Sequence, residues 1–464
     1  MSGSFLWRVV AAGLVTLAIV TPAQAKKPFG VQVTAPDATG SPTTSDAGFS
    51  SVSDAVDYLD PDSLRALYPT IDTAAVLVAV DFRGLPQGML LTFANNDGLL
   101  DFQVPLFNFS RTFGRACLPA VPGNCADVRR DGLRELQDFL QSNPQFLKRL
   151  LTAMARFSPI DPLAGNPDSL FSRSMRADFQ QGFTHKVSQI WGCNTTAFNG
   201  SFGAPIMVAA VGGVADIFAD AQERAARLQA QNEIGFGVMY SATSAESGAD
   251  EYATTGITVP LSYTVKFDSD PRKKLRFDLP LGYTDTEGAV SYALGVGLAY
   301  THPLSDVWTL TPAIGAGATG SDDLGAAGGV SSYSLTSAYT WRLGGFALSM
   351  GNAVGKYDAL ALKIGDVEAE ADISNTVFTN GLLLTGPNSL IARNLIMEYS
   401  ITDTRITGDE VYADSYDEFG VALGYINTTM GVIDSYSKVG LSYLVGSGDL
   451  GDISSLRLNL SVRF

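Results

Sequence analysis

The carboxyl-terminal half of the chain alternates between apolar and polar residues. In its last stretch, residues 453–464, Leu456, Leu458, Leu460, Val462 and Phe464 alternate with serine, arginine and asparagine. A period of two predicts a β-strand with one apolar and one polar face. The same alternation recurs upstream, although the segment near 377–384 is poorly patterned. We therefore predict twelve strands, at 234–240, 257–267, 275–283, 290–300, 308–314, 333–341, 346–350, 377–384, 395–401, 419–425, 439–445 and 456–464.

Two further features of this half favour a membrane over a soluble sheet. Aromatic residues recur at strand ends, as the girdles at the two membrane surfaces require. Short connections such as PLSD alternate with mostly longer ones such as SAESGADEYA, which is typical of transmembrane barrels. Lipid admits only closed sheets. We expect an all-β transmembrane fold: a 12-stranded antiparallel outer-membrane β-barrel over residues 234–464, with both barrel ends in the periplasm because the strand number is even.

The inward-facing positions of the clearest strands are mostly small, which predicts a lumen of intermediate bore. Residues 214–232 (VADIFADAQERAARLQAQN) form the clearest helix and directly precede the first strand. We predict that this linker, residues 213–233, lies in the lumen. The helix carries Asp216, Asp220, Glu223, Arg224 and Arg227, and its polar stripe would pair with inward-facing Arg276, Lys438, Arg457 and Arg463. The alternative is a helix packed on a periplasmic domain, which leaves an open pore.

The amino-terminal half has a different character. Residues 26–55 are rich in Ser, Thr, Gly, Asp and Pro, which indicates a flexible leader. Strand-like runs follow at 74–82, 89–93 and 99–104. From residue 130 the period becomes helical, with helices around 133–140, 146–154 and 168–191. We expect residues 56–212 to form a small α+β domain, periplasmic or displayed, with the helices packed on its core.

The chain begins with an export signal. Arg8 is followed by the apolar run 9–20 and by the small-residue site at Ala23 and Ala25. This run is too short to span a bilayer, so residues 1–25 are predicted to be a secretory signal peptide whose cleavage leaves Lys26 first. No later run is long enough for a membrane helix. The predicted location is the bacterial outer membrane.

Net charge narrows the possible partners. A formal charge of −16 argues against nucleic acid, because phosphate binding needs a basic surface. Acidic residues gather in the predicted outward loops, with Asp366, Glu368, Glu370 and Asp372 at every second position. That run could bind calcium or bridge divalent ions in lipopolysaccharide. A solvated extension of the neighbouring strands explains it better, because it lacks EF-hand spacing.

The three cysteines suggest one disulfide. Cys117 and Cys125 are separated by a Pro- and Gly-containing loop, and in an oxidising compartment they are predicted to pair. Cys193 is then left over, although pairing of Cys193 with either of the other two is an open alternative. The spacing fits no zinc template, so we predict no metal and no cofactor.

Candidate catalytic residues have little support. Ser63 and Ser169 both lie in Pro-Asp-Ser-Leu, faintly like an esterase motif but without its glycine, and both stand where a helix cap is expected. The two histidines, His185 and His302, lack the local context of a hydrolase base. We expect that the protein is not an enzyme.

An alanine-rich helix leading into a twelve-stranded barrel that ends in Phe resembles the autotransporter β-domain, over about residues 213–464. The whole chain is most similar to the solitary outer-membrane autotransporter-like proteins, since residues 26–212 are too short and non-repetitive for a long β-helical passenger. The resemblance implies a barrel that anchors or translocates its short amino-terminal domain. The alternative is a transport pore with that domain as a periplasmic accessory or plug. Implied partners are outer-membrane lipid, lipopolysaccharide and the barrel-assembly machinery, while the oligomeric state is left open.

The terminal strand, with Leu460, Val462 and Phe464 on its apolar face, resembles the assembly signal of outer-membrane barrels. Deleting Phe464 should therefore lower the amount of folded, heat-modifiable protein in the outer membrane, measured by its shift on semi-native gels. Wild-type amounts of folded protein after the deletion would contradict this prediction.

Overall fold

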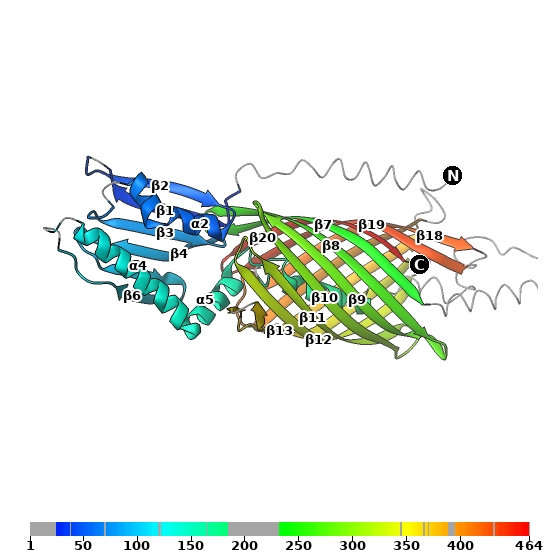
Figure 1. Ribbon diagram of the computed structural model, residues 1–464. Coiled ribbons are helices and arrows are strands. Elements are labelled where there is room, and N and C mark those ends of the chain that lie inside the picture. The colour runs from blue at the N-terminus through cyan, green and yellow to red at the C-terminus, as the bar shows by residue number, and fades with distance from the viewer. Residues whose placement is uncertain are drawn as a thin grey trace, which may run out of the picture.

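The computed structural model describes residues 25–464 except 38, 69–70, 119–120, 122, 165, 184–231, 344–345, 365–366, 370, 388–394, 430–431 and 464. It has two parts, a closed barrel and a sheet-and-helix domain at one end of that barrel (Figure 1). None of the helices in these described residues is long and apolar enough to cross a membrane.

The barrel confirms the predicted strands. Its twelve antiparallel strands are β7 (Glu233–Ser247), β8 (Asp250–Phe267), β9 (Asp270–Thr286), β10 (Ala289–Pro303), β11 (Trp308–Ser321), β12 (Ala326–Leu343), β13 (Phe346–Leu360), β16 (Ser374–Pro387), β17 (Leu395–Gly408), β18 (Ser415–Thr429), β19 (Val432–Gly448) and β20 (Gly451–Arg463). Each strand pairs with its neighbours in the sequence, and β20 pairs with β7 to close the sheet.

Closure places both ends of the barrel at the same rim. Arg463 of β20 lies opposite Gly235 of β7, two residues after the first strand begins. We call this end the terminal rim. The opposite end, where the hairpins β7–β8, β9–β10 and β19–β20 turn, is the docking rim.

Side chains alternate across the barrel wall as the period of two predicts. Outward-facing apolar residues are exposed, for example Leu294 and Phe419 at 48% and 50%. Inward-facing residues such as Thr311, Thr336 and Ala338 are only 1% exposed. The outer surface is therefore an apolar belt, and the lumen wall is lined by small residues.

The connections at the docking rim are shorter than the sequence suggests. Strands β7 and β8 join through residues 248–249, and β9 and β10 through residues 287–288. The expected loops there are mostly strand, because the alternation continues past the apolar belt and the ladder pairs the peptide groups. Longer connections are residues 361–373, which contain the hairpin β14 (Leu362–Ile364) and β15 (Val367–Ala369), and residues 409–414.

The amino-terminal domain is a six-stranded sheet with helices. Its strands run in the order β2-β1-β3-β4-β5-β6, and a 3-10 turn, η2 (Pro105–Phe107), follows β5. Its remaining elements are β1 (Phe29–Pro36), β2 (Pro42–Phe49), α2 (Val52–Tyr58), α3 (Pro61–Leu67), β3 (Val76–Phe82), β4 (Leu85–Phe93), β5 (Leu100–Val104), β6 (Phe109–Phe113), α4 (Asn124–Ser142) and α5 (Pro144–Phe157). Helices α4 and α5 are the first two predicted helices, and they bring Phe139 and Phe146 together with Phe109 of the sheet in one aromatic core.

Part of the predicted leader is ordered structure. Residues 29–49 form β1 and β2, and Val31 and Val33 of β1 are fully buried. Their alternation with Gln32 and Thr34 is a strand signal, but the Ser, Thr, Gly and Pro content around it indicates a flexible segment when composition alone is considered. Tertiary pairing with β3 outweighs that composition.

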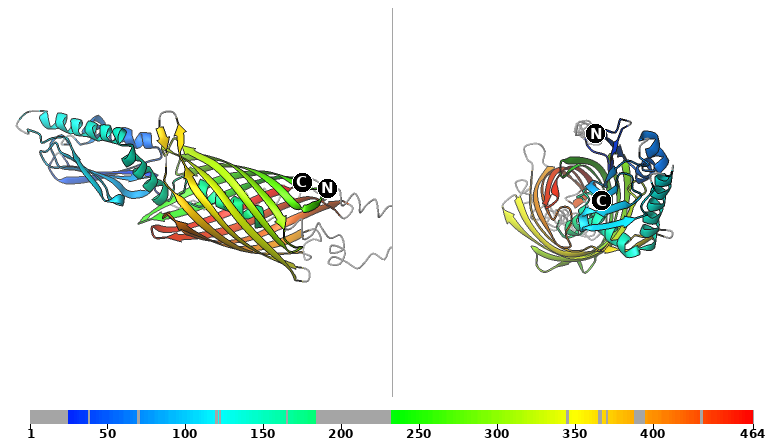
Figure 2. Two further views of the ribbon diagram at one scale, coloured as in Figure 1. Left: turned by 90° about the horizontal axis from the view of Figure 1, so that it is seen from below. Right: turned by 90° about the vertical axis from the view of Figure 1, so that its left-hand side faces the viewer.

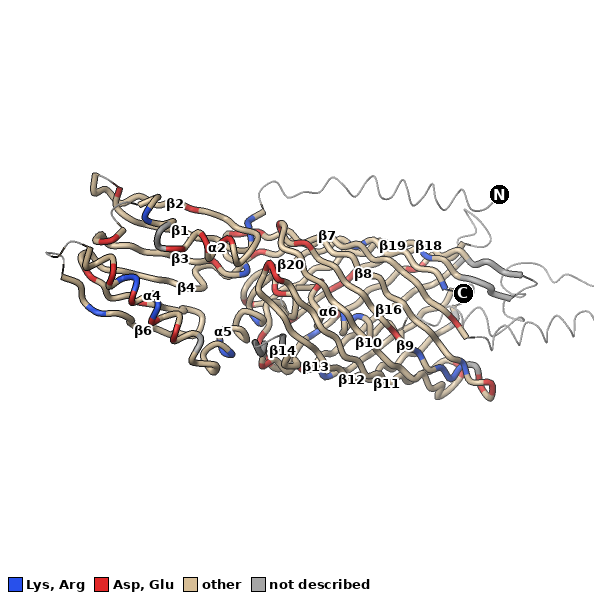
Figure 3. The backbone as a smooth tube through the Cα atoms, viewed as in Figure 1, with Lys and Arg blue, Asp and Glu red and all other residues tan. Residues whose placement is uncertain are grey.

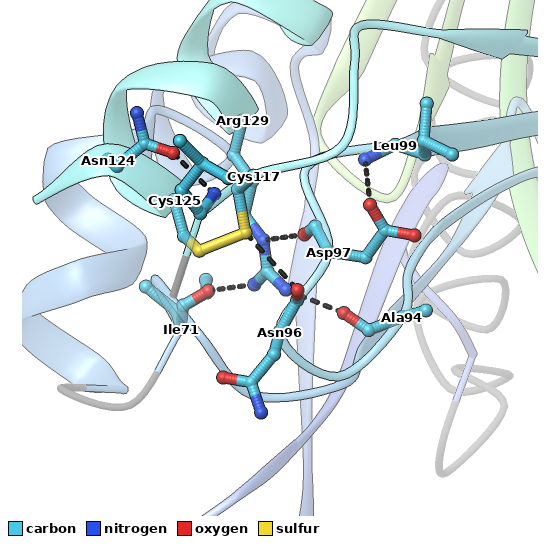
Figure 4. The surroundings of a disulfide bond; sticks show 10 residues. Ile71, Ala94, Asn96, Asp97, Leu99, Cys117, Asn124, Cys125 and Arg129 are labelled. Atoms are coloured by element: carbon cyan, nitrogen blue, oxygen red, sulfur yellow. Dashed lines mark hydrogen bonds between the residues drawn. A yellow bond between two sulfur atoms is a disulfide. The ribbon is translucent and has the colours of Figure 1, made fainter. Parts of the chain in front are cut away.

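The domain contains the predicted disulfide between Cys117 and Cys125, which closes the loop before α4 (Figure 4). Next to it, the Arg129 guanidinium donates hydrogen bonds to the carbonyl oxygens of Ile71, Ala94 and Asp97, the last at 2.8 Å. Burial lowers the pKa of Arg129 to about 10, against the opposing effect of nearby carboxylates. The disulfide loop and the start of α4 are therefore held against the turn that precedes β5.

Mass spectrometry of a non-reduced digest of the exported protein should recover a peptide pair linked through Cys117 and Cys125. Replacing both cysteines by serine should make the domain more sensitive to protease, since closing a loop of this length contributes about 2–3 kcal/mol. A digest in which both thiols are free, or in which either is linked to Cys193, would contradict the pairing.

Candidate functional site: the helix-filled barrel interior

The helix α6 (Leu170–Phe183) lies inside the barrel (Figure 3). It packs against β10, β11, β12, β13 and β16. Ten of its fourteen residues are buried, including Arg173, Met175, Asp178 and Phe183, whereas Gln180 is exposed and lines a cavity. A helix buried over most of its surface is enclosed by protein. The third predicted helix therefore belongs to the lumen and not to the amino-terminal core to which the sequence assigned it.

Glycines in the barrel wall make room for this helix. A Cβ on Gly351 of β13 would overlap the ring of Phe183, and one on Gly381 of β16 would lie 2.8 Å from Phe179. Phe179 and Phe183 stack with ring centroids 4.8 Å apart. The two aromatic residues thus lie on wall positions that lack side chains, which fixes the rotation of α6 and its height in the barrel.

Buried carboxylates fasten both halves of the helical segment to the wall. Asp168, just before α6, accepts hydrogen bonds from Ser241 Oγ at 2.9 Å and Thr243 Oγ1 at 2.7 Å, both on β7. Asp178 in the helix accepts one from the Tyr357 hydroxyl of β13 at 3.0 Å. Because β7 and β13 lie on opposite parts of the wall, these bonds hold the segment across the lumen.

A charged cluster joins the helix to β18 and β20. Arg457, which is fully buried, pairs with Glu418 at 3.1 Å and donates to the Pro167 carbonyl oxygen at 3.4 Å. Arg176 of α6 approaches the same Glu418 at 3.8 Å. Leaving one buried charge without its partner costs several kcal/mol, so helix and wall depend on each other here.

The predicted inward-facing basic residues all lie on the lumen side, but they pair with the wall. Besides Arg457 with Glu418, the pairs are Arg276 with Asp278 at 2.6 Å, Lys438 with Glu398 at 3.2 Å, and Arg463 with Glu233 at 3.9 Å. Their expected partners Asp216, Asp220, Glu223, Arg224 and Arg227 lie outside the described residues, as does Phe464. In β20, Leu460 and Val462 face outward, on the strand face opposite to Arg457.

A cavity of about 160 Å³ lies beside α6, on its side toward β16–β20. The helix contributes the apolar Met175, Phe179 and Phe183 together with the polar Arg176 and Gln180. The barrel wall contributes mostly polar residues, which include both Glu398 and Glu418. Two of the residues that line the cavity, Tyr416 and Leu444, belong to a buried cluster near the docking rim; the cluster also contains Ala245, Tyr412, Ala413 and Ile453. Within the described part of the chain, no group of three or more His, Cys, Asp or Glu side chains is placed to hold a metal ion.

The amino-terminal domain lies against the docking rim (Figure 2), and the buried Arg83 joins the two. Arg83, in the turn between β3 and β4, pairs with Asp161 at 3.0 Å and donates to the carbonyl oxygens of Leu324 and Gly325 in the β11–β12 turn. Burial lowers the pKa of Arg83, while the Asp161 carboxylate opposes that shift. The Arg83 guanidinium therefore connects the domain, the barrel and residues 158–169, which lead to α6.

The start of the described chain adds a second attachment. The Lys26 ammonium lies 2.6 Å from Asp81 in the domain and 2.8 Å from Asp250 in β8. The backbone N–H of Lys26 donates to the Glu251 carbonyl oxygen at 2.8 Å. Further along the rim, the Arg156 Nε donates to the carbonyl oxygen of Glu410 at 2.7 Å. The domain is thus attached to several hairpins of the docking rim.

Sequence reasoning missed α6 as the lumen helix, together with Asp168, Asp178 and Glu418. The available signal was the glycines at inward-facing positions of β13 and β16, which match aromatic residues spaced four apart in 168–183. Ser63 lies in α3, and Ser169 directly precedes α6. The Ser169 Oγ accepts a hydrogen bond from the Ser172 N–H at 3.4 Å, in the first turn of α6.

No protein-family model and no curated protein sequence matches this chain. Similar solved structures include the translocator domain of the autotransporter NalP from Neisseria meningitidis (16% identity, 54% of this chain and 98% of that one, TM-score 0.36). Others are the β domain of the Bordetella autotransporter BrkA (13%, 50% and 99%, TM-score 0.40) and an outer-membrane channel from Pseudomonas putida F1 (15%, 50% and 94%, TM-score 0.34). The strand pairing and the outward apolar belt define the protein itself as a closed twelve-stranded outer-membrane β-barrel protein.

The glycine fit of α6 can be tested with two substitutions of equal size. Gly351→Ala places a methyl group against the Phe183 ring, and overpacking of this kind costs about 1–3 kcal/mol. Gly320→Ala in β11 is the control, because its nearest neighbour lies 3.9 Å from the new Cβ. We expect the unfolding midpoint of the barrel, followed by heat-modifiable gel mobility, to fall for Gly351→Ala only. Equal midpoints for the two variants would contradict this packing of α6.

Proposed function

We propose that this protein anchors its own amino-terminal domain at the cell surface and keeps it there. The observation that carries the proposal is the position of the two rims. Both ends of the barrel lie at the terminal rim, whereas the domain contacts the docking rim through Lys26, Arg83 and Arg156. An even number of strands places both barrel ends on the same side of the membrane. If the first strand starts in the periplasm, the terminal rim faces the periplasm and the domain at the docking rim is outside the cell.

The lumen helix supports retention of the domain. It follows the domain in the sequence and is fastened by Asp168, Asp178 and Arg176 to three different strands. A domain continuous with a helix held in this way does not leave the barrel unless the chain is cut. Its attachments to the docking rim act in the same direction. We therefore favour an anchor over the release of a secreted passenger.

The alternative, a transport pore, receives less support from the described interior. The space that a pore needs is occupied by α6 on the side of β10–β13. The remaining cavity is lined in part by Tyr416, which packs in a buried cluster with Tyr412. A role without catalysis also fits a domain whose buried polar groups, such as Arg83 and Asp161, serve attachment.

An epitope inserted at each end of the molecule tests the orientation. One copy goes after Gly40, in the exposed turn between β1 and β2. The matched control goes after Asp306, which is 94% exposed in the β10–β11 turn at the terminal rim. On intact cells, antibody should bind the first epitope and not the second, and both after the outer membrane is permeabilised. The reverse pattern would place the domain in the periplasm and refute surface display.

A further inference from the structure

The apolar belt of the barrel contains a pair of asparagines on its lipid-facing side. Asn352 of β13 and Asn380 of β16 are directly opposite each other in the strand ladder, and both side chains are exposed. Their outward neighbours along the two strands are apolar and 37–46% exposed: Met350, Val354, Phe378 and Leu382. Apolar residues therefore flank the pair on both sides along each strand, and the polar Lys356 and Thr376 follow one row further toward the docking rim.

These two amides do not satisfy each other. The Asn352 Nδ2 donates to the Asn380 Oδ1 at 2.7 Å. Within the described residues, this leaves the Asn352 Oδ1 and the Asn380 Nδ2 without another hydrogen bond. Exchanging oxygen and nitrogen in both amides inverts the pair but again leaves one acceptor and one donor. Acyl chains offer neither, and a polar group left unsatisfied in hydrocarbon is costly.

The pair is part of a longer polar row. Ser337 of β12 lies opposite Asn352, and Asp403 of β17 lies opposite Asn380. Asp403 pairs with Arg405 at 2.7 Å on the same outer face. Polar residues thus cross four adjacent strands on one side of a barrel whose belt is otherwise apolar over β8–β10.

We propose that the outer face of β12, β13, β16 and β17 is the interface between two copies of this chain in the membrane. A free donor beside a free acceptor is self-complementary, so a two-fold axis near the pair brings the acceptor of each copy to the donor of the other. Hydrogen bonds between polar side chains are one of the contributions to the association of membrane helices. A headgroup of a lipid lies at the membrane surface, whereas this pair has exposed apolar residues on both sides along each strand.

Cysteine cross-linking in native outer membranes tests the interface, with the full chain and with Cys193 replaced by serine. Val354→Cys and Met350→Cys flank Asn352 on the outer face. Ile257→Cys on β8 is the control, because it is 41% exposed like Val354 and lies on the opposite side of the strand order. Mild oxidation should convert at least one of the first two variants, and not the control, to a disulfide-linked dimer of this chain.

A second comparison separates the asparagine pair from chance proximity. Adding Asn352→Leu and Asn380→Leu to the same cysteine variants should reduce the dimer at least tenfold, while the folded barrel persists on semi-native gels. Dimer yields unchanged by the leucines would overturn the proposal. So would cross-linking of Ile257→Cys to the same extent, the absence of any dimer, or a cross-link to a protein of different mass. Neither result bears on surface display, which the epitopes test separately.

Discussion

A peptide group in lipid must find its hydrogen-bond partner within the protein, and this barrel meets that requirement by pairing β20 with β7. Closure with twelve strands has a second consequence. Eight strands fill their own interior with side chains, whereas sixteen leave a water channel, so twelve strands enclose a space that their side chains do not fill. The inward-facing residues here are small, which widens that space. The helix α6 occupies this space. Its position also determines where residues 158–169 and the amino-terminal domain before them lie.

The polar interior and the helix are mutually dependent. Arg457 is fully buried in the wall, and its charge is balanced by Glu418, which also meets Arg176 of the helix. Asp168 reaches β7 through two hydroxyl groups. Strands β18, β20 and β7 lie on one side of the barrel, whereas Asp178 of the helix binds Tyr357 of β13 on the opposite side, so no single strand holds α6. Such buried ion pairs add little net stability, but they make one rotation and one height of the helix far better than the others.

The barrel could be predicted from sequence because its signal is local. Leu456, Leu458 and Leu460 are apolar and alternate with polar residues. This alternation arises because one face of the strand meets lipid and the other meets the polar lumen. The lumen helix could not be assigned in the same way. The spacing of Phe179 and Phe183 predicts a helix with an apolar face, but periodicity does not tell whether that face meets a domain core or a barrel wall. The glycines that receive these two rings, Gly351 and Gly381, lie far away in the sequence. Only the fold brings the rings and the glycines together. The strand β1 was missed for a related reason, because its partner β3 decides its state.

The arrangement also constrains the order of assembly under the proposed orientation. A six-stranded sheet is about 24 Å wide, from five spacings of about 4.8 Å, and carries α4 and α5 besides. A helix is about 10–12 Å across with its side chains, and α6 with the adjoining cavity takes up the described lumen. The folded domain is therefore too wide to pass through the closed barrel. Either the chain crosses before β20 meets β7, or it crosses unfolded and the sheet forms afterwards. In both cases the hydrogen bonds of Arg83 to Leu324 and Gly325 and the ion pair of Lys26 with Asp250 can form only when the domain is already on the far side, so docking follows the crossing of the chain.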